Sequence, residues 1–256
     1  MTASSRLRSL WPREHGAYAQ LALPLLAALL VRTPTLPAGL FAIAAVGAFL
    51  ANEPILVLLG HRGARHVTSD GPRSRRRLWG LAATTLVAGT AGIALANNPT
   101  LVVTSLAAIP AFALVGIATR GGQHTLVAEL VAAVALPAAA APVAVASGVA
   151  VSSAMLVWGA WALGYGASVI AVHRVIARHR RAAGQLDRAI AVALCTAIVI
   201  ACVVASWFPI VSVVLPLLAL STALVMRPPR ARHLRAIGIA LVAASVASVF
   251  VAIVLV

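Results

Sequence analysis

Three glutamates, Glu14, Glu53 and Glu129, are the residues of this sequence best suited to do chemistry. The chain of 256 residues has only five acids, and these three lie in or beside long apolar stretches. An ionisable group at the centre of an apolar membrane segment costs roughly 2.5 kcal/mol or more, so such groups usually serve a function. Carboxylates in these places can accept and release protons during a reaction or a transport step.

Polar neighbours extend these glutamates into a predicted pocket. Asn52 precedes Glu53, and polar helix at depth is tolerated mainly where it lines a cavity. His15 follows Glu14, and a histidine beside a carboxylate can perform acid–base chemistry without a metal. The candidate catalytic residues are Glu14, His15, Glu53 and Glu129, and the candidate substrate-binding residues are Tyr18, Gln20, Asn52, Arg62, Arg65, Tyr165, His173, Arg174 and Arg178.

A purely structural interpretation of the acids stays open. Glu53 or Glu129 could pair with Arg174 or with a loop arginine, and such a pair would lock helices together without forming a site. The spacing of Trp158, Trp161 and Tyr165 is equally ambiguous. Residues three and seven positions apart lie on one helix face, so they predict either a packing stripe or an apolar wall for a lipid or isoprenoid.

The composition shows which kind of element must position these residues. Apolar residues make up 62% of the chain and charged residues only 10%, whereas a soluble domain carries roughly 25% charged residues. The apolar residues lie in blocks, and about 20 such residues are needed to cross a membrane. All 20 basic residues are arginine, but no segment is long enough for a soluble nucleic-acid-binding domain, so we expect no nucleic-acid partner.

The apolar blocks predict an all-α, polytopic membrane protein with one transmembrane domain over residues 1–256. Each block must be a helix, because an open strand would leave backbone groups unpaired in lipid. The fifth block contains Pro137 and Pro142 and is either a kinked span or a helix followed by a re-entrant piece. The nine predicted helices are 17–32, 38–60, 78–96, 100–118, 124–148, 152–177, 187–206, 209–226 and 235–256.

The arginines orient these nine spans. With the N-terminus in the cytoplasm and the C-terminus outside, Arg32 is the only one of the 20 basic residues on the outer side, which is a strong positive-inside signal. The most basic connections run from His61 to Arg77 and from Arg178 to Asp187. We therefore expect a protein of the inner (plasma) membrane, with its functional face and its contacts to anionic lipid headgroups on the cytoplasmic side.

The start of the first predicted helix, Pro12-Arg13-Glu14-His15-Gly16-Ala17-Tyr18, resembles the opening motif of the YwiC-like family of bacterial membrane proteins. Asn52 to Pro54 and Arg235 to Gly238 also match. The resemblance runs from about residue 11 to the end of the chain. It implies a membrane protein, but it does not imply a biochemical role.

The number of helices and the two basic connections also resemble the plan of the UbiA-type intramembrane prenyltransferases. That resemblance implies a helical bundle with a cavity for an isoprenoid, and two aspartate-rich motifs that hold Mg²⁺ against a diphosphate. The first motif would be Asn-Asp-x-x-Asp-x-x-x-Asp, but this chain has Asn52-Glu53 followed by Leu56 and Gly60 at the metal-binding positions. The second motif would fall near Val172-His173-Arg174, which has no aspartate. We therefore expect no conventional Mg²⁺ site and no other cofactor.

These observations favour a membrane protein that binds or modifies a lipid or isoprenoid-like molecule in a cytoplasm-facing pocket. Arg62, Arg65, Arg174 and Arg178 would hold an anionic headgroup or a diphosphate. Two other classes stay open. One is a transporter coupled to protons through the same glutamates. The other is a non-catalytic membrane protein whose basic loops dock acidic proteins or anionic lipids.

Overall fold

A computed structural model describes residues 15–121, 125–178, 185–229 and 233–255. These residues are helical almost throughout, and no strand occurs among them. In chain order the elements are α1 (His15–Leu30), α2 (Leu36–Leu58), α3 (Ala64–Leu95), α4 (Asn98–Thr119), α5 (Leu126–Ala138), α6 (Ala140–Ala146), α7 (Val151–Arg178), α8 (Gln185–Trp207), the 3-10 helix η1 (Pro209–Val214), α9 (Leu215–Met226) and α10 (Leu234–Leu255). The prediction of an all-helical protein is confirmed.

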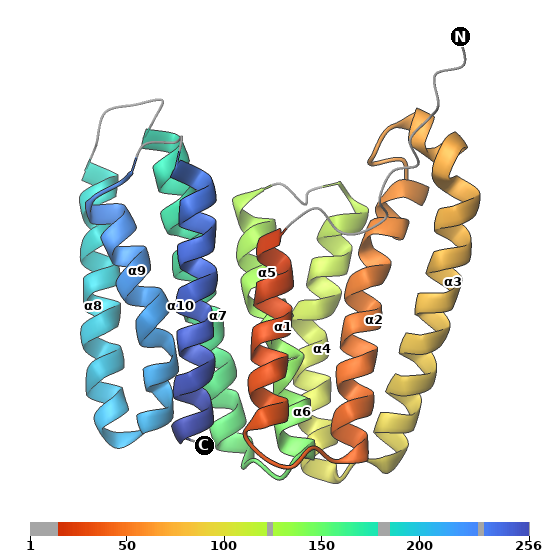
Figure 1. The fold of residues 1–256 in the computed structure, drawn as a ribbon, viewed down its shortest axis with the longest axis horizontal. Coiled ribbons are helices and arrows are strands. Elements are labelled where there is room, and N and C mark those ends of the chain that lie inside the picture. The colour runs from red at the N-terminus through yellow and green to blue at the C-terminus, as the bar shows by residue number, and fades with distance from the viewer. Residues whose placement is uncertain (1–14, 122–124, 179–184, 230–232, 256) are drawn as a thin grey trace.

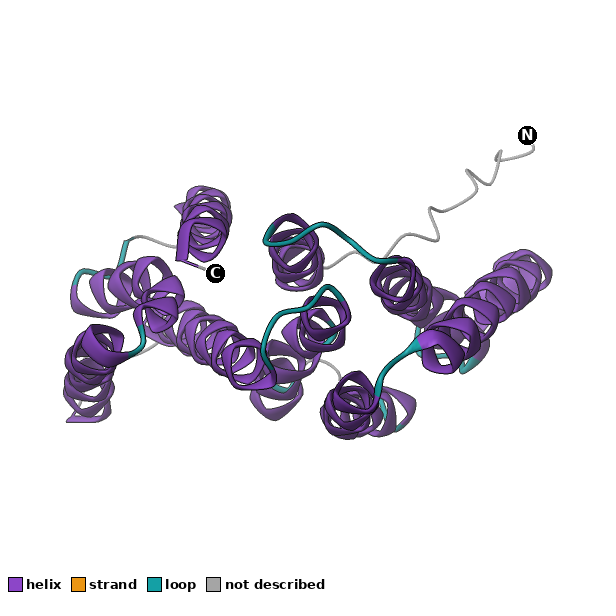
Figure 2. Cartoon of the chain, turned by 90° about the horizontal axis from the view of Figure 1, so that it is seen from below, coloured by secondary structure: helices purple, strands orange, loops and turns teal. Residues whose placement is uncertain are grey.

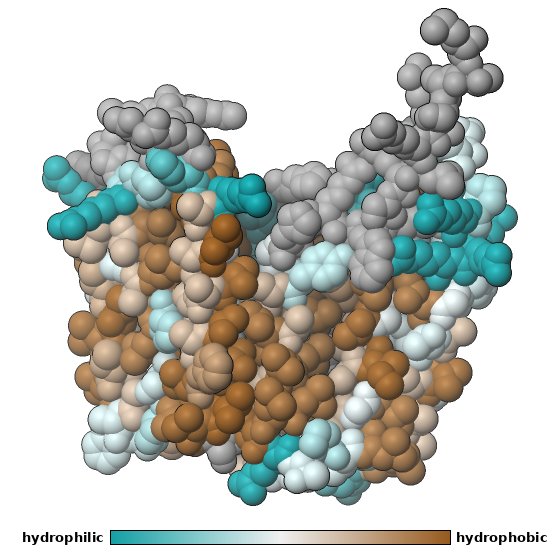
Figure 3. Space-filling view, viewed as in Figure 1, coloured by the Kyte–Doolittle hydropathy of each residue, from teal (hydrophilic) through white to brown (hydrophobic). Residues whose placement is uncertain are grey.

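The described residues include eight helical segments that are long and apolar enough to cross a membrane. The first predicted span, 17–32, corresponds to the shorter apolar helix Gly16–Leu30, which has fewer than the roughly 20 residues of a typical crossing. Figure 3 shows apolar side chains over the middle of the visible face, with hydrophilic side chains towards its two ends. These properties are those of a multi-pass membrane protein.

The third helix departs from its predicted boundaries. It begins at Ala64 rather than at residue 78, so most of the predicted basic connection His61 to Arg77 is helix. Hydropathy marks where a segment becomes apolar, but arginine and alanine are both good helix formers and let a helix continue beyond the apolar part. Gly63 has a φ of +96° and makes the turn before the helix.

The fifth predicted block forms two consecutive helices, α5 and α6, that meet at Ala139. Pro137 has no backbone N–H to donate and its ring crowds the preceding turn, which accounts for the interruption. Leu126–Ala146 nevertheless qualifies as one apolar segment of 21 residues. Of the two predicted alternatives, this length favours the kinked span.

The helices form two groups that lie side by side in Figures 1 and 2. The first group contains α1 to α6, and the second contains α7 to α10 with η1. The two groups meet where α5 packs on α7 and α1 packs on α10. Most candidate site residues lie near helix termini at one end of the molecule, the upper one in Figure 1. These termini are the starts of α1, α3 and α5 and the ends of α2 and α7. We call this end of the molecule the arginine-rich end.

Close packing in the second group depends on a glycine. Gly164 of α7 faces Leu217 of α9, and a Cβ at Gly164 would lie 2.9 Å from Leu217 Cδ1 and 3.0 Å from Leu217 Cβ. One turn further along α7 and α9, the hydroxyls of Ser168 and Ser221 lie 3.2 Å apart and are buried. Without a hydrophobic driving force in lipid, small residues at such contacts let helices approach and gain dispersion energy.

We predict that Gly164→Ala destabilises the protein by about 1–3 kcal/mol, because the added methyl group overpacks the contact with Leu217. The matched control is Gly159→Ala on the same helix, where a Cβ would meet no atom within 4 Å. This substitution should leave the stability of the protein unchanged or raise it slightly. Unfolding in a detergent titration measures both. Equal effects of the two substitutions would contradict the packing role of Gly164.

Candidate functional site

Glu53, near the end of α2, is bound on both carboxylate oxygens by Arg62. The Arg62 Nε donates to Oε1 at 3.0 Å and Nη2 donates to Oε2 at 2.6 Å. The Glu53 side chain is 3% exposed. A bidentate arginine–carboxylate pair is among the strongest charged hydrogen-bond arrangements, so Glu53 is neutralised within its own helical hairpin.

The turn between α2 and α3 brings Arg62 back to Glu53. After α2 ends at Leu58, Gly60 has a φ of +78°, a conformation that glycine adopts without strain. The chain therefore reverses within a few residues, and Arg62 reaches a carboxylate nine positions earlier. This is the predicted structural alternative for Glu53, with a loop arginine as its partner rather than Arg174.

Tyr18 of α1 lies beside this pair. Its ring packs edge-on against Phe49 of α2, with the ring centroids 5.0 Å apart. Arg77 of α3 and Glu53 are both close enough to interact electrostatically with Tyr18. Tyr18 thus joins α1, α2 and α3 at the arginine-rich end.

Glu129 of α5 pairs with His173 of α7. The distance between Glu129 Oε2 and His173 Nε2 is 2.8 Å, and the side chains are 42% and 35% exposed. Among the described residues, Glu129 Oε1 and His173 Nδ1 have no hydrogen-bond partner. The pair therefore joins two helices and still offers one acceptor atom and one imidazole nitrogen to a further molecule.

Local structure favours this position for a carboxylate. The Thr125 hydroxyl caps α5 by accepting a hydrogen bond from Ala128 N at 3.2 Å. Glu129 follows in the first turn, where the positive end of the helix dipole stabilises a negative charge. His173 lies on α7, the helix on which α5 packs. These two helices hold the pair in place.

The other candidate residues take several roles. Tyr165 is buried, and its hydroxyl donates to the Ala19 carbonyl at 3.1 Å, so it ties α7 to α1. Gln20, Asn52 and Arg174 are half-buried. The prediction for Glu14, and those for the side chains of His15, Arg65 and Arg178, fall outside the described residues.

The glutamates that the sequence assigns to one pocket belong to two different polar pairs in the structure. Glu53 belongs to the pair of helices α2 and α3, whereas Glu129 belongs to the packed helices α5 and α7. Hydropathy places both acids near the same end of the bundle but contains no information on which helices are neighbours. Within the described part of the chain, no group of three or more histidines, cysteines and acids could hold a metal ion.

Sequence reasoning missed two features of the arginine-rich end. Asp70, which the sequence places in a basic connection, is buried within α3. His61 approaches the turn after α4, where its Nε2 would lie 3.7 Å from a Cβ at Gly121. The positive φ of Gly121 is a conformation that favours glycine, and the His61 contact is visible only in the folded chain.

The fold and these polar pairs define a helical, multi-pass membrane protein with carboxylate pairs at its arginine-rich end. The chain matches the family described as "YwiC-like protein" over residues 11–145. Because this is slightly more than half of its 256 residues, the chain belongs to the YwiC-like family, as its opening motif predicts. Neither the curated proteins nor the solved structures contain a match.

We predict that Arg62→Met destabilises the protein by about 3 kcal/mol, because it leaves the buried Glu53 carboxylate without its partner. The double variant with Glu53→Gln should lose at least about 1 kcal/mol less than the sum of the two single losses, since neighbouring residues couple. A double-mutant cycle in detergent unfolding measures this coupling. Arg120→Met, at the exposed cap of α4, is the control and should cost less than about 0.5 kcal/mol. Additive single effects would show that the pair is not a lock.

Proposed function

We propose that this protein binds, and in doing so can modify, an anionic lipid or isoprenoid-like molecule at its arginine-rich end. In this proposal the chain crosses the plasma membrane nine times, with the N-terminus in the cytoplasm and the C-terminus outside. The helix α1 is then a crossing in addition to the eight longer apolar segments. A helix of this length can cross where the bilayer is locally thinner. The distribution of arginines supports this orientation, because only Arg32 follows an outward-running helix.

The observation that carries the proposal is the half-exposed pair of Glu129 and His173. Glu53 has no free oxygen, since Arg62 occupies both. Among the residues that the structure describes, Glu129 and His173 each keep one polar atom without a hydrogen-bond partner, and both side chains remain accessible. An ionised Glu129 carboxylate orients the imidazole ring of His173. The Nδ1 atom of His173 can then accept a proton from a bound hydroxyl group or donate one to a leaving group.

Arginines at the same end would bind the anionic part of the ligand. Arg75, Arg76 and Arg120 are exposed, and Arg174 follows His173 directly on α7. Guanidinium groups bind phosphate oxygens through paired hydrogen bonds. A phosphate or diphosphate headgroup near Arg174 would place the adjacent carbon chain towards the apolar middle of the bundle.

The proposal needs no divalent metal. A two-metal diphosphate site of the prenyltransferase kind requires several free carboxylates. Here Leu56 and Gly60 have no carboxylate, and the Glu53 carboxylate is held by Arg62. Any relation to the UbiA-type scaffold would therefore extend to the helical bundle and the apolar chain, with acid–base chemistry at Glu129 and His173 in place of metal chemistry.

The broken α5–α6 segment favours a second candidate, proton-coupled transport. Transporters often use discontinuous helices near the membrane centre, and α5 ends at Ala138 beside Pro137. Glu129 and His173 on α5 and α7 would then carry the coupled proton. Acidification of proteoliposomes that depends on Glu129 would favour transport over lipid binding.

Native mass spectrometry of the protein purified with its endogenous lipids tests the lipid proposal. We predict a lipid adduct of defined mass that is weakened about tenfold or more by Glu129→Gln and by His173→Asn, because each removes a charge-assisted contact. Glu53→Gln should retain the adduct in the protein that remains folded.

The matched control is Arg188→Gln on α8, which removes an exposed charge at the same end of the molecule. It should weaken the adduct by less than about threefold, as expected for an exposed ionic contact. Adducts that are equally abundant in wild type, Glu129→Gln and His173→Asn would refute the proposed site.

A further inference from the structure

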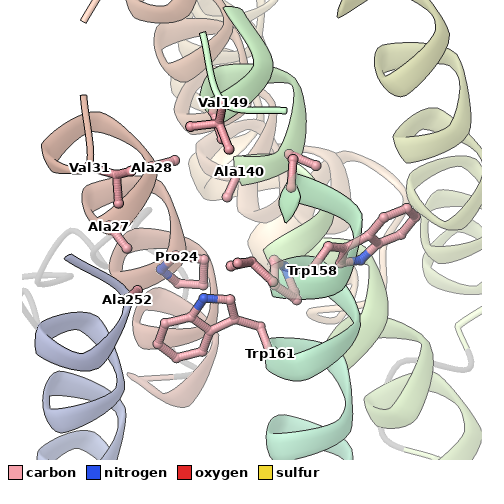
Figure 4. Close-up of a pocket in the computed structure, with 14 residues that line it drawn as sticks. Pro24, Ala27, Ala28, Val31, Ala140, Val149, Trp158, Trp161 and Ala252 are labelled. Atoms are coloured by element: carbon pink, nitrogen blue, oxygen red, sulfur yellow. The ribbon is translucent and has the colours of Figure 1, made fainter. Parts of the chain in front are cut away.

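A small cavity lies between the two groups of helices, far from the Glu129–His173 pair. Its volume is about 30 Å³, and α1, α5, α6, α7 and α10 all contribute to its wall. Figure 4 shows Pro24 and Ala27 of α1, Trp161 of α7 and Ala252 of α10 around it. Val157 and Trp158 on its rim are partly exposed, so the cavity is not sealed.

The cavity holds one buried hydrogen-bond donor without a partner. Trp161 is 1% exposed, and its indole Nε1 has no hydrogen-bond acceptor. In Figure 4 this nitrogen points towards Pro24 and Ala252. Trp158 differs, because its Nε1 donates to the Val134 carbonyl at 2.9 Å. An indole N–H can only donate, and leaving a buried donor unpaired is costly. Trp161 therefore requires an acceptor oxygen.

Water is a poor candidate for this acceptor. A buried water needs two to four polar partners, but the side chains of the wall are alanine, proline, valine and tryptophan. Trp161 supplies a single donor. A volume of about 30 Å³ takes roughly two water-sized groups. A carbonyl oxygen with the adjoining part of a carbon chain fits both the volume and the chemistry.

We propose that this cavity binds a membrane-soluble apolar molecule through one carbonyl oxygen, which accepts a hydrogen bond from Trp161 Nε1. The carbon atoms next to the carbonyl pack against the small side chains of α1, α6 and α10, and the rest of the chain extends out of the cavity past its open rim at Val157 and Trp158. Trp161 is ten residues from the start of α7 at Val151, or about 15 Å along the helix. This depth is close to the middle of a hydrocarbon core of about 30 Å, where only such a molecule is soluble.

This site goes beyond the proposed function and does not depend on it. His173 lies twelve residues beyond Trp161 on α7, which is about 18 Å along the helix. Substitution of Glu129 or His173 should therefore leave the cavity unchanged, and occupation of the cavity should not require the arginine-rich end.

The indole N–H signals of ¹⁵N-tryptophan-labelled protein in detergent test the inference. The chain has five tryptophans, and Trp161→Phe assigns the Trp161 signal. We predict that 2-decanone moves the Trp161 proton downfield in a saturable manner, because a carbonyl accepts its hydrogen bond. Decane, which has the same carbon chain but no oxygen, should produce no downfield shift. Glu129→Gln should respond as the wild type does.

A filled cavity is the second arm of the test. Ala28→Leu places a larger side chain at the cavity wall and should abolish the response to 2-decanone. Ala83→Leu on the exposed face of α3 is the matched control and should retain it. Equal responses to 2-decanone and decane in the wild type, or no response to either, would overturn the inference. A ketone-specific response that persists in folded Ala28→Leu would also overturn it.

Discussion

The absence of water from the bilayer interior is the constraint on which the rest of this structure depends. A polar group in that region must be paired within the protein. Helices satisfy this requirement for the backbone, and the Arg62–Glu53 pair satisfies it for Glu53, which is more deeply buried than the other described acids. Most of the other described arginines lie at the arginine-rich end, where headgroups and water can solvate them, and Arg32 lies at the opposite end of the molecule.

The same constraint leaves two glutamates in different surroundings. Glu53 and Glu129 are both glutamates in apolar helices, but Glu53 is 3% exposed and held on both oxygens, whereas Glu129 is 42% exposed and held on one. A carboxylate that is fully paired stabilises a hairpin and has little left to offer a ligand. A carboxylate that is half-paired with a histidine across two helices can exchange a proton. The local pairing, rather than the residue type, separates these two acids and is the reason that the proposed function uses Glu129.

Small residues and prolines produce both a close helix contact and a cavity in the bundle. Gly164 lets α7 and α9 approach closely, whereas Pro24 and several alanines leave a cavity beside Trp161. Because lipid tails are as apolar as leucine, these helices gain stability from close packing and from hydrogen bonds rather than from hydrophobic burial. In such a packed interior, the unpaired indole N–H of Trp161 therefore requires a hydrogen-bond acceptor.

The sequence by itself determined the helical class, the multi-pass character and the family, because hydropathy and motif are local properties. Only the tertiary structure decided that Glu53 pairs with Arg62 and that Glu129 pairs with His173. It also decided that Trp161 faces a cavity while Trp158, three residues earlier, has a partner. The physical reason is that depth in a membrane follows from position along one helix, whereas pairing depends on which helices are neighbours. No pattern within a single segment specifies those neighbours.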